Sequence, residues 1–128
     1  MWNICGHTLQ PGEKIQVYLE PNVDGYGIPT TLICGARPGK TVLVTAQIHS
    51  GEYPGTPAVI HIARDIDPRE LSGNLILMHC VNVSGFWSKE PTLIPEDGFN
   101  LNGDYPGRPD GTVGERDVYK RQVFGQHR

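Results

Sequence analysis

The sequence predicts an α/β fold organised around a strand–helix–strand unit between residues 41 and 83. Residues 41–48 are apolar at nearly every position, which is typical of a central strand covered on both faces. Apolar side chains then recur at helical spacing up to residue 66, and residues 74–83 form a second buried run. Two strands joined by one helix pair in parallel with a right-handed crossover.

The residues before this unit predict a loop and two further strands. Residues 1–13 show no regular pattern, whereas residues 14–20 alternate between polar and apolar, as in a half-buried strand. Residues 21–27 are turn material, and residues 28–37 form the second strand. A Pro-Gly-Lys turn follows, so this strand is predicted to form a hairpin with residues 41–48.

The helix of the central unit has predicted ends and a predicted inner face. Thr56 is placed to be its N-cap, with Pro57 at the first helical position, and Asp67-Pro68 ends it. The apolar side chains that share one face are Val59, Ile62, Ala63 and Ile66.

The last third of the chain predicts an ordered loop and one more helix. Residues 85–111 hold too many apolar side chains for a disordered linker, so we expect an ordered wall of a functional site. Thr112 and Glu115 fit a capping box that opens a helix. Residues 117–128 turn basic and lose the expected apolar face, so this end is predicted to be a truncation or a sequence-assembly scar.

Composition sets limits on the class of protein. With 128 residues, one domain or a piece of a larger one is expected. The net charge of -3 argues against nucleic acid or an acidic membrane as a partner. The N-terminus has no signal-peptide pattern, and no apolar run is long enough to span a membrane. Three widely spaced cysteines form no disulfide framework, which favours reduced thiols and a cytoplasmic location.

His49 and Glu52 are the candidate metal ligands. They follow the end of the strand at residues 41–48, and in a parallel pair both carboxyl ends lie at the same edge of the sheet, where α/β ligand sites form. Zinc accepts neutral imidazole and carboxylate oxygen as ligands, and a catalytic site uses three protein ligands and one water. The alternative is a surface turn whose His and Glu are simply solvated.

The other histidines are weaker candidates. His61 is predicted to lie at the surface of the helix, and His79 lies inside a buried strand, where a hydrogen-bonded core histidine is expected. His7 and His127 lie near the termini without a motif. Either a third zinc ligand comes from outside this sequence, or the site is not a zinc site.

Two blocks carry a resemblance to a known family. They are AQIHSGEYPGTPA at residues 46–58 and PEDGFNLNGDYPGRPDGTVGERDVY at residues 95–119. In this order they resemble the succinylglutamate desuccinylase/aspartoacylase family, a branch of the zinc carboxypeptidases, over residues 28–116. The resemblance implies a three-layer α/β/α fold with a mixed central sheet, of which residues 1–128 form the N-terminal, incomplete part of one catalytic domain.

The resemblance also implies a chemistry. His49 and Glu52 become ligands of one Zn²⁺ ion, while the family's further histidine ligand and its general-base glutamate have no counterpart in these residues. The implied enzyme is a zinc-dependent amidohydrolase that acts on a small molecule, either an N-acyl amino acid or a peptide-like substrate. This chain alone, which then contains no catalytic residue, is expected to be inactive.

The sequence departs from the family pattern where substrate is bound. The family usually reads Asn-Leu-Asn-Arg in the second block, but here Asn102 precedes Gly103. Asn102 is kept as a substrate-binding candidate, with an asparagine that stabilises its own loop as the alternative. A second family arginine has no obvious match; Lys89 is the nearest cation, and Arg108 is not expected to reach the site. A catalytically dead binding module that keeps the fold and pocket is therefore the alternative function.

Overall fold

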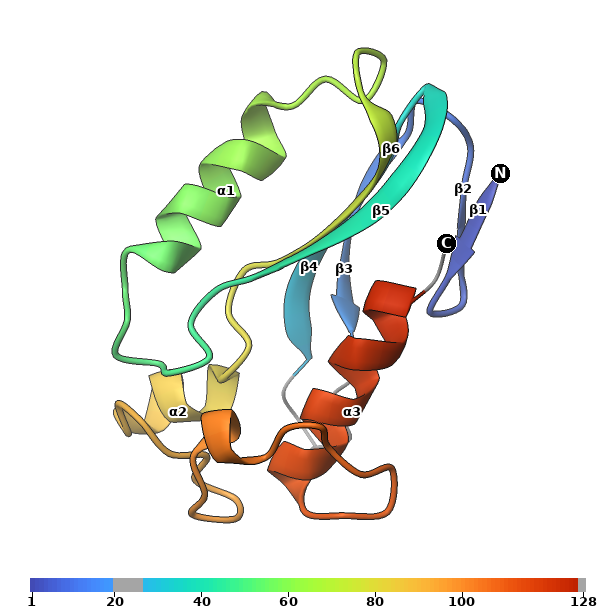
Figure 1. The fold of residues 1–128 in the computed structure, drawn as a ribbon. Coiled ribbons are helices and arrows are strands. Elements are labelled where there is room, and N and C mark those ends of the chain that lie inside the picture. The colour runs from blue at the N-terminus through green and yellow to red at the C-terminus, as the bar shows by residue number, and fades with distance from the viewer. Residues whose placement is uncertain (20–26, 127–128) are drawn as a thin grey trace.

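The computed structural model describes residues 1–19 and 27–126, and it places a four-stranded sheet between two helices (Figure 1). Helix α1 (Gly55–Asp65) covers one face of the sheet, and helix α3 (Val113–Gln126) lies on the other. The predicted three-layer α/β/α fold with a mixed sheet is confirmed. The predicted turn at residues 21–27 lies outside the described residues except for Gly27, as does His127.

The sheet has the strand order β3-β4-β6-β5. Its strands are β3 (Lys14–Leu19), β4 (Ile28–Cys34), β5 (Arg37–Thr45) and β6 (Ser72–Met78). β4 pairs antiparallel with both β3 and β6, whereas β5 and β6 are parallel. The predicted parallel pair joined by a helix is therefore confirmed, with α1 between its two strands.

The predicted hairpin between the second and third strands is wrong. Strand β6 lies between β4 and β5, because Ile76 is the partner of Leu32 on one side and of Leu43 on the other. Three consecutive residues of β6, from Ile76 to Met78, have no exposed surface, and the interior of the sheet is where such a strand is best buried.

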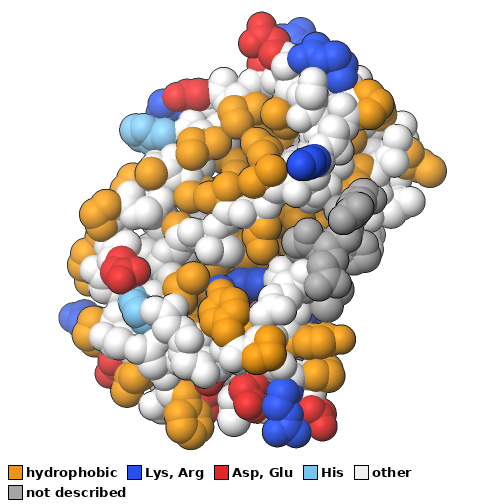
Figure 2. All heavy atoms as spheres, in the orientation of Figure 1, with side chains coloured by type: hydrophobic (Ala, Val, Ile, Leu, Met, Phe, Trp, Pro, Cys, Tyr) orange, Lys and Arg blue, Asp and Glu red, His pale blue; other side chains and the backbone are white. Residues whose placement is uncertain are grey.

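The prediction that the third strand is central and covered on both faces is also wrong. Within residues 1–19 and 27–126, β5 is an edge strand with one partner, and the side chain of Val42 is 49% exposed. Hydrophobic side chains are accordingly visible along the course of β5 in Figure 2. An apolar sequence shows that a strand is suited to burial, but whether it is buried depends on which strands and helices pack beside it.

The core has two parts, one on each face of the sheet. The part under α1 is formed by Ile33, Ala46, Val59, Ala63 and Leu77. The larger part on the opposite face joins the sheet to the N-terminal hairpin, the long loop and α3; it includes Trp2, Leu9, Leu32, Ile76, Ile94, Leu101 and Val118. The long loop is thus ordered by its own buried side chains.

Helix α1 begins one residue before the predicted N-cap. Pro54 occupies the cap position without a side-chain cap hydrogen bond, so the prediction of Thr56 as N-cap is wrong. The Thr56 hydroxyl instead lies within hydrogen-bond distance of the Gln47 side chain and the His79 carbonyl. Val59 and Ala63 are buried as predicted, but Ile62 is 41% exposed.

The first thirteen residues are not a simple loop. β1 (Trp2–Ile4) and β2 (His7–Leu9) form an antiparallel hairpin. Its two turn residues, Cys5 and Gly6, both have positive φ, at 50° and 79°, which is typical of a tight two-residue hairpin turn. Cys5 is exposed, whereas Cys34 and Cys80 are buried; all three thiols are free.

The long loop contains two short helical segments, α2 (Val83–Ser88) and the 3₁₀ helix η1 (Leu101–Gly103). The predicted capping box before α3 is confirmed. The Glu115 backbone N–H donates to the Thr112 hydroxyl at 3.3 Å, and the Thr112 backbone N–H donates to the Glu115 carboxylate at 2.8 Å. No helix among the described residues is long and apolar enough to cross a membrane.

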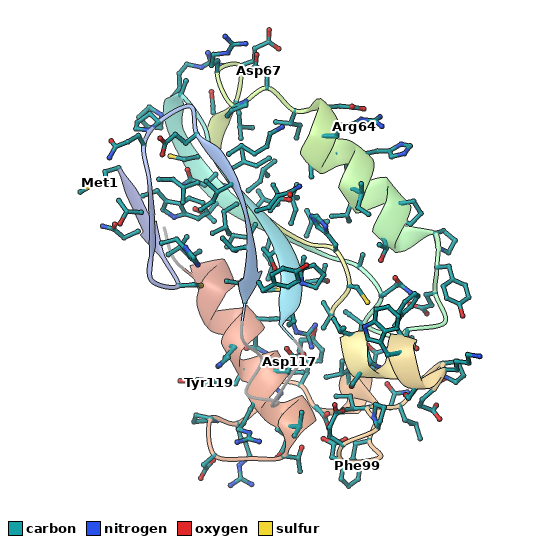
Figure 3. The ribbon with its side chains drawn as sticks, turned by 180° about the vertical axis from the view of Figure 1, so that it is seen from behind. Met1, Arg64, Asp67, Phe99, Asp117 and Tyr119 are labelled. Carbon is teal, nitrogen blue, oxygen red and sulfur yellow. The ribbon has the colours of Figure 1, made fainter. Side chains whose placement is uncertain are left out.

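Residues 117–126 continue α3, and the inner face of this stretch carries charge. Asp117 and Arg121 are both buried, with 3.1 Å between carboxylate and guanidinium. Figure 3 shows Asp117 on the side of the helix that faces the sheet, and Tyr119 on the outer side. That residues 117–128 are not native to the protein stays a prediction.

Candidate metal-binding site

His49 and Glu52 lie in the turn that follows β5, at the edge of the sheet where β5 and β6 end. The turn is closed by the Glu52 backbone N–H, which donates to the His49 carbonyl at 3.1 Å. The His49 Nδ1 atom lies 3.2 Å from the Glu52 Oε1 atom. The two predicted ligands therefore converge on one point, and the Glu52 side chain leaves that point open because it is 68% exposed.

Asn100 determines which nitrogen of His49 carries hydrogen. The Asn100 Oδ1 atom accepts a hydrogen bond from the Asn102 backbone N–H at 3.0 Å, so this end of the amide must be the oxygen. The same oxygen lies 2.9 Å from His49 Nε2. Because an amide oxygen only accepts, His49 Nε2 must be the protonated nitrogen, and the neutral imidazole then presents its lone pair at Nδ1.

The lone pair at His49 Nδ1 points at a carboxylate oxygen, an arrangement that needs positive charge between the two atoms. A proton can supply it, since the hydrogen bond with Asn100, followed by the one with Glu52, raises the pKa of His49 above its ordinary value. A metal cation would supply it equally well. The turn therefore places His49 and Glu52 where a proton or a metal ion would fit between them.

The pair fits zinc in donor type and spacing. With zinc bonds of about 2.0–2.1 Å, two ligands of a tetrahedral ion lie roughly 3.3 Å apart, close to the observed 3.2 Å between Nδ1 and Oε1. Asn100 also supplies the outer hydrogen bond that metal-bound histidines nearly always make. Within residues 1–19 and 27–126 no group of three His, Cys, Asp or Glu side chains could hold a metal ion, so this part of the chain offers the pair His49 and Glu52 without a third such ligand.

Neighbouring loops hold the turn in place. The Gly51 backbone N–H donates to the Pro91 carbonyl at 3.0 Å, and the Ser50 hydroxyl donates to the Glu90 carbonyl at 2.5 Å. The fit at Gly51 is tight, because a Cβ at this position would lie 3.0 Å from the Pro91 side chain. The long loop therefore forms one wall of the site, as predicted.

The predicted substrate-binding residue lies nearby but does not reach the pair. Asn102 is exposed in η1, and it is its backbone N–H that contacts Asn100. Lys89 is exposed as the left-handed C-cap of α2. Arg108 is exposed and lies 3.5 Å from Asp110. Neither Lys89 nor Arg108 is thus shown in contact with His49.

Of the other histidines, His61 lies where the sequence predicted, whereas His79, predicted inside a strand, lies one residue beyond the end of β6. His61 is exposed on α1. His79 is half-buried, with its Nε2 atom 2.9 Å from the Thr31 hydroxyl, and burial lowers its pKa. It is therefore hydrogen-bonded as predicted, but at a half-buried position instead of in the core.

Asn100 is the residue that sequence reasoning missed. Its signal was present, since Asn100 stands two residues before Asn102, the spacing at which an asparagine side chain accepts from a later backbone N–H. That pattern predicts a local turn. Contact with a histidine 51 residues away follows only from the folded chain.

Fold and site together define an α/β protein with a His–Glu turn at the carboxyl edge of a mixed sheet. The chain matches the succinylglutamate desuccinylase/aspartoacylase catalytic domain over residues 38–124. It belongs to this family.

Relatives extend the comparison to named enzymes. The chain is 33% identical over 89 residues to the N-alpha-acetyl-L-2,4-diaminobutyric acid deacetylase of Halomonas elongata, covering 70% of this chain and 25% of that protein. It is 30% identical to the crystal structure of a succinylglutamate desuccinylase/aspartoacylase from Rhodobacter sphaeroides, with a TM-score of 0.72 over 91% of this chain and 37% of that one.

A second structure is similar to the same extent. The product-bound ectoine utilization protein EutE (DoeB) from Ruegeria pomeroyi is 30% identical, with a TM-score of 0.77 over 93% of this chain and 38% of that chain. The present chain thus spans between a quarter and two fifths of these relatives, and its fold is correspondingly incomplete.

Proposed function

We propose that this chain supplies the first two protein ligands, His49 and Glu52, of a single zinc ion in an enzyme that hydrolyses the amide bond of an N-acyl amino acid. The supporting observation is the 3.2 Å approach of His49 Nδ1 to Glu52 Oε1, with Asn100 holding the proton on the opposite nitrogen.

Zinc in such a site polarises the acyl carbonyl and lowers the pKa of a bound water to about 7. The residues of this chain orient the ion and form part of its surroundings. A third ligand and a general base have to be supplied by residues beyond these 128, so the chain alone is expected to bind zinc weakly and to hydrolyse nothing.

The substrate class is supported by the relatives. The Halomonas elongata protein is named as a deacetylase of an N-acetylated diamino acid. Asn102, exposed at the rim in η1, is proposed as a contact for the substrate. We expect a cytoplasmic enzyme with a small-molecule substrate.

A second function, a binding module without catalysis, is favoured by one observation. Gly103 stands where the family carries an arginine, and glycine cannot make the two parallel hydrogen bonds with which arginine grips a carboxylate. A substrate without a free carboxylate would reconcile Gly103 with an active enzyme.

Zinc titration followed by nuclear magnetic resonance (NMR) tests the proposal. Resonances of residues 49–52 should shift on addition of Zn²⁺ to the wild-type chain, and His49→Ala should abolish the shifts. The matched control is His61→Ala, which removes an exposed histidine from α1 and should leave binding unchanged. Equal binding by wild type and His49→Ala would exclude this turn as the zinc site.

A further inference from the structure

Gln47 adopts a backbone conformation that its place in the fold does not explain. Among the described residues, three residues other than glycine have positive φ: Cys5, Gln47 and Lys89. Cys5 lies in a hairpin turn and Lys89 is a helix C-cap, where left-handed conformations are common. Gln47, with φ of 48°, lies between the end of β5 and the turn that carries His49. A left-handed conformation costs a residue other than glycine free energy, so it persists only where surrounding contacts hold it in place. Such residues are often found at functional sites.

The side chain of Gln47 is buried and makes polar contacts at both ends. It is 5% exposed, its Nε2 donates to the Ser50 carbonyl at 2.6 Å, and its Oε1 lies within hydrogen-bond distance of the Thr56 hydroxyl. One amide therefore connects the residue after His49 to the first turn of α1. Both of its polar atoms are used, as a buried amide requires.

The backbone of Gln47 is held as well. Its carbonyl accepts from the Asn82 N–H at 3.0 Å, in the segment that follows β6. The carbonyl of Ala46 accepts from the Val81 N–H at 2.9 Å. These two hydrogen bonds continue the pairing of β5 with β6 for two residues beyond the strands. The chain then leaves the sheet at Gln47, the residue with the left-handed backbone conformation.

We propose that Gln47 is the positioning residue of the metal-binding turn, because its left-handed backbone and buried amide aim His49 and Glu52 at one point. This inference rests on the proposed function. Gln47 does not touch the ion; it acts through Ser50, whose carbonyl lies between the two ligand residues in sequence. Loss of the amide should free the turn while the sheet stays intact.

Two variants distinguish the contribution of the Gln47 side-chain amide from that of its left-handed backbone conformation. Gln47→Met keeps an unbranched side chain of similar length without the amide, and Gln47→Gly keeps the left-handed conformation without strain. The matched control is Cys5→Met, which places the same side chain at a φ of 50° in a hairpin remote from the turn. If Gln47→Met fails to fold, Gln47→Gly still tests the loss of the side-chain amide.

Amide hydrogen exchange without metal is the first measurement. The Gly51 and Glu52 amides, which donate to Pro91 and His49, should exchange at least tenfold faster in both Gln47 variants, with β6 amides unchanged. Cys5→Met should leave all of these rates as in the wild type. Unchanged exchange at Gly51 and Glu52, or equal acceleration throughout β6, would overturn the proposal.

Zinc titration of the same samples is the second measurement. Both Gln47 variants should bind Zn²⁺ about 10- to 100-fold more weakly than wild type, the range typical for loss of a residue that supports a ligand. Wild-type affinity in both variants would also overturn the proposal. If the wild-type chain binds no zinc, the proposed function fails, and the exchange rates still decide whether Gln47 positions the turn.

Discussion

The His49 Nε2 atom lies 2.9 Å from the Asn100 Oδ1 atom, although 51 residues separate them in sequence. This contact joins the turn after β5 to the start of η1, so these two segments support each other through one hydrogen bond. It leaves Nδ1 of His49 as the nitrogen that faces Glu52.

Removing the Asn100 side chain should weaken zinc binding. We expect Asn100→Ala to lower the affinity by about 10- to 100-fold, because the imidazole loses the bond that sets its tautomer and its orientation. Asn100→Asp, which keeps an acceptor oxygen, should retain most of the affinity. Asn102→Ala is the control, since its backbone N–H remains; a similar loss in that variant would show that the Asn100 contact is not what supports the ion.

Zinc affinity should rise with pH through the pKa of His49. Asn100 first and Glu52 second raise this pKa, and zinc needs the unprotonated Nδ1. Below the raised pKa, affinity should change by about tenfold per pH unit and then level off above it. Titrations from about pH 5 to pH 8 would locate the midpoint, which Asn100→Ala should move to lower pH.

The raised pKa of His49 should also make the stability of the metal-free protein depend on pH, with the opposite sign: zinc affinity rises with pH, whereas this contribution to stability falls. A folded state that holds the proton more tightly than the unfolded chain is stabilised at low pH, and this contribution is lost as pH rises through the folded pKa. Unfolding of the metal-free wild type and His49→Gln across this range should therefore differ most at low pH. A difference that grew with pH would show that the pKa is lowered instead.

His79 should contribute with the reverse sign. Burial lowers its pKa, so the unfolded chain binds the proton more readily than the folded protein. Stability should fall as pH drops below the ordinary histidine value of about 6.5, by at most about 1.4 kcal/mol per pH unit. Urea unfolding of His79→Gln should lack this slope, whereas His61→Gln, changed at an exposed position, should keep it.

Lys14 should stabilise the contact between α1 and the sheet. Its Nζ donates to the carbonyls of Ala63, Ile66 and Arg64 at 2.7, 2.9 and 3.3 Å, which caps the C-terminal end of α1 from strand β3. We expect Lys14→Met to lower the free energy of unfolding by about 1–3 kcal/mol, because helix-end carbonyls lose a charged donor. Lys40→Met, an exposed lysine on β5, should change it by less than about 0.5 kcal/mol.

Among the described residues β5 pairs on one side only, and its other edge should promote self-association. Strands with unpaired backbone groups and exposed apolar side chains pair with other chains, and a charge on the edge suppresses this. Val42→Lys should therefore reduce light scattering of concentrated protein. Ile62→Lys makes the same change on α1 at comparable exposure, 41% against 49%, and should have a smaller effect; an equal effect would point to general hydrophobicity instead of the edge.

The local elements follow from the sequence because their causes are local. Alternation predicted β3, helical spacing predicted α1, and the Thr112–Glu115 capping box predicted the start of α3. The pair His49 and Glu52 could be singled out because both follow directly after an apolar run. Each of these predictions needs only side chains within a few residues of one another.

Strand order and site geometry were decided by the tertiary structure. The insertion of β6 between β4 and β5 depends on competition among strands for the buried place, which no single segment reveals. Tertiary contacts also decided the role of Thr56. Its hydroxyl lies within hydrogen-bond distance of the Gln47 side chain and the His79 carbonyl instead of capping its own helix. The sequence by itself determined which side chains could bind a cation; only the folded chain brought Asn100 to His49, because that contact depends on packing between segments far apart in sequence.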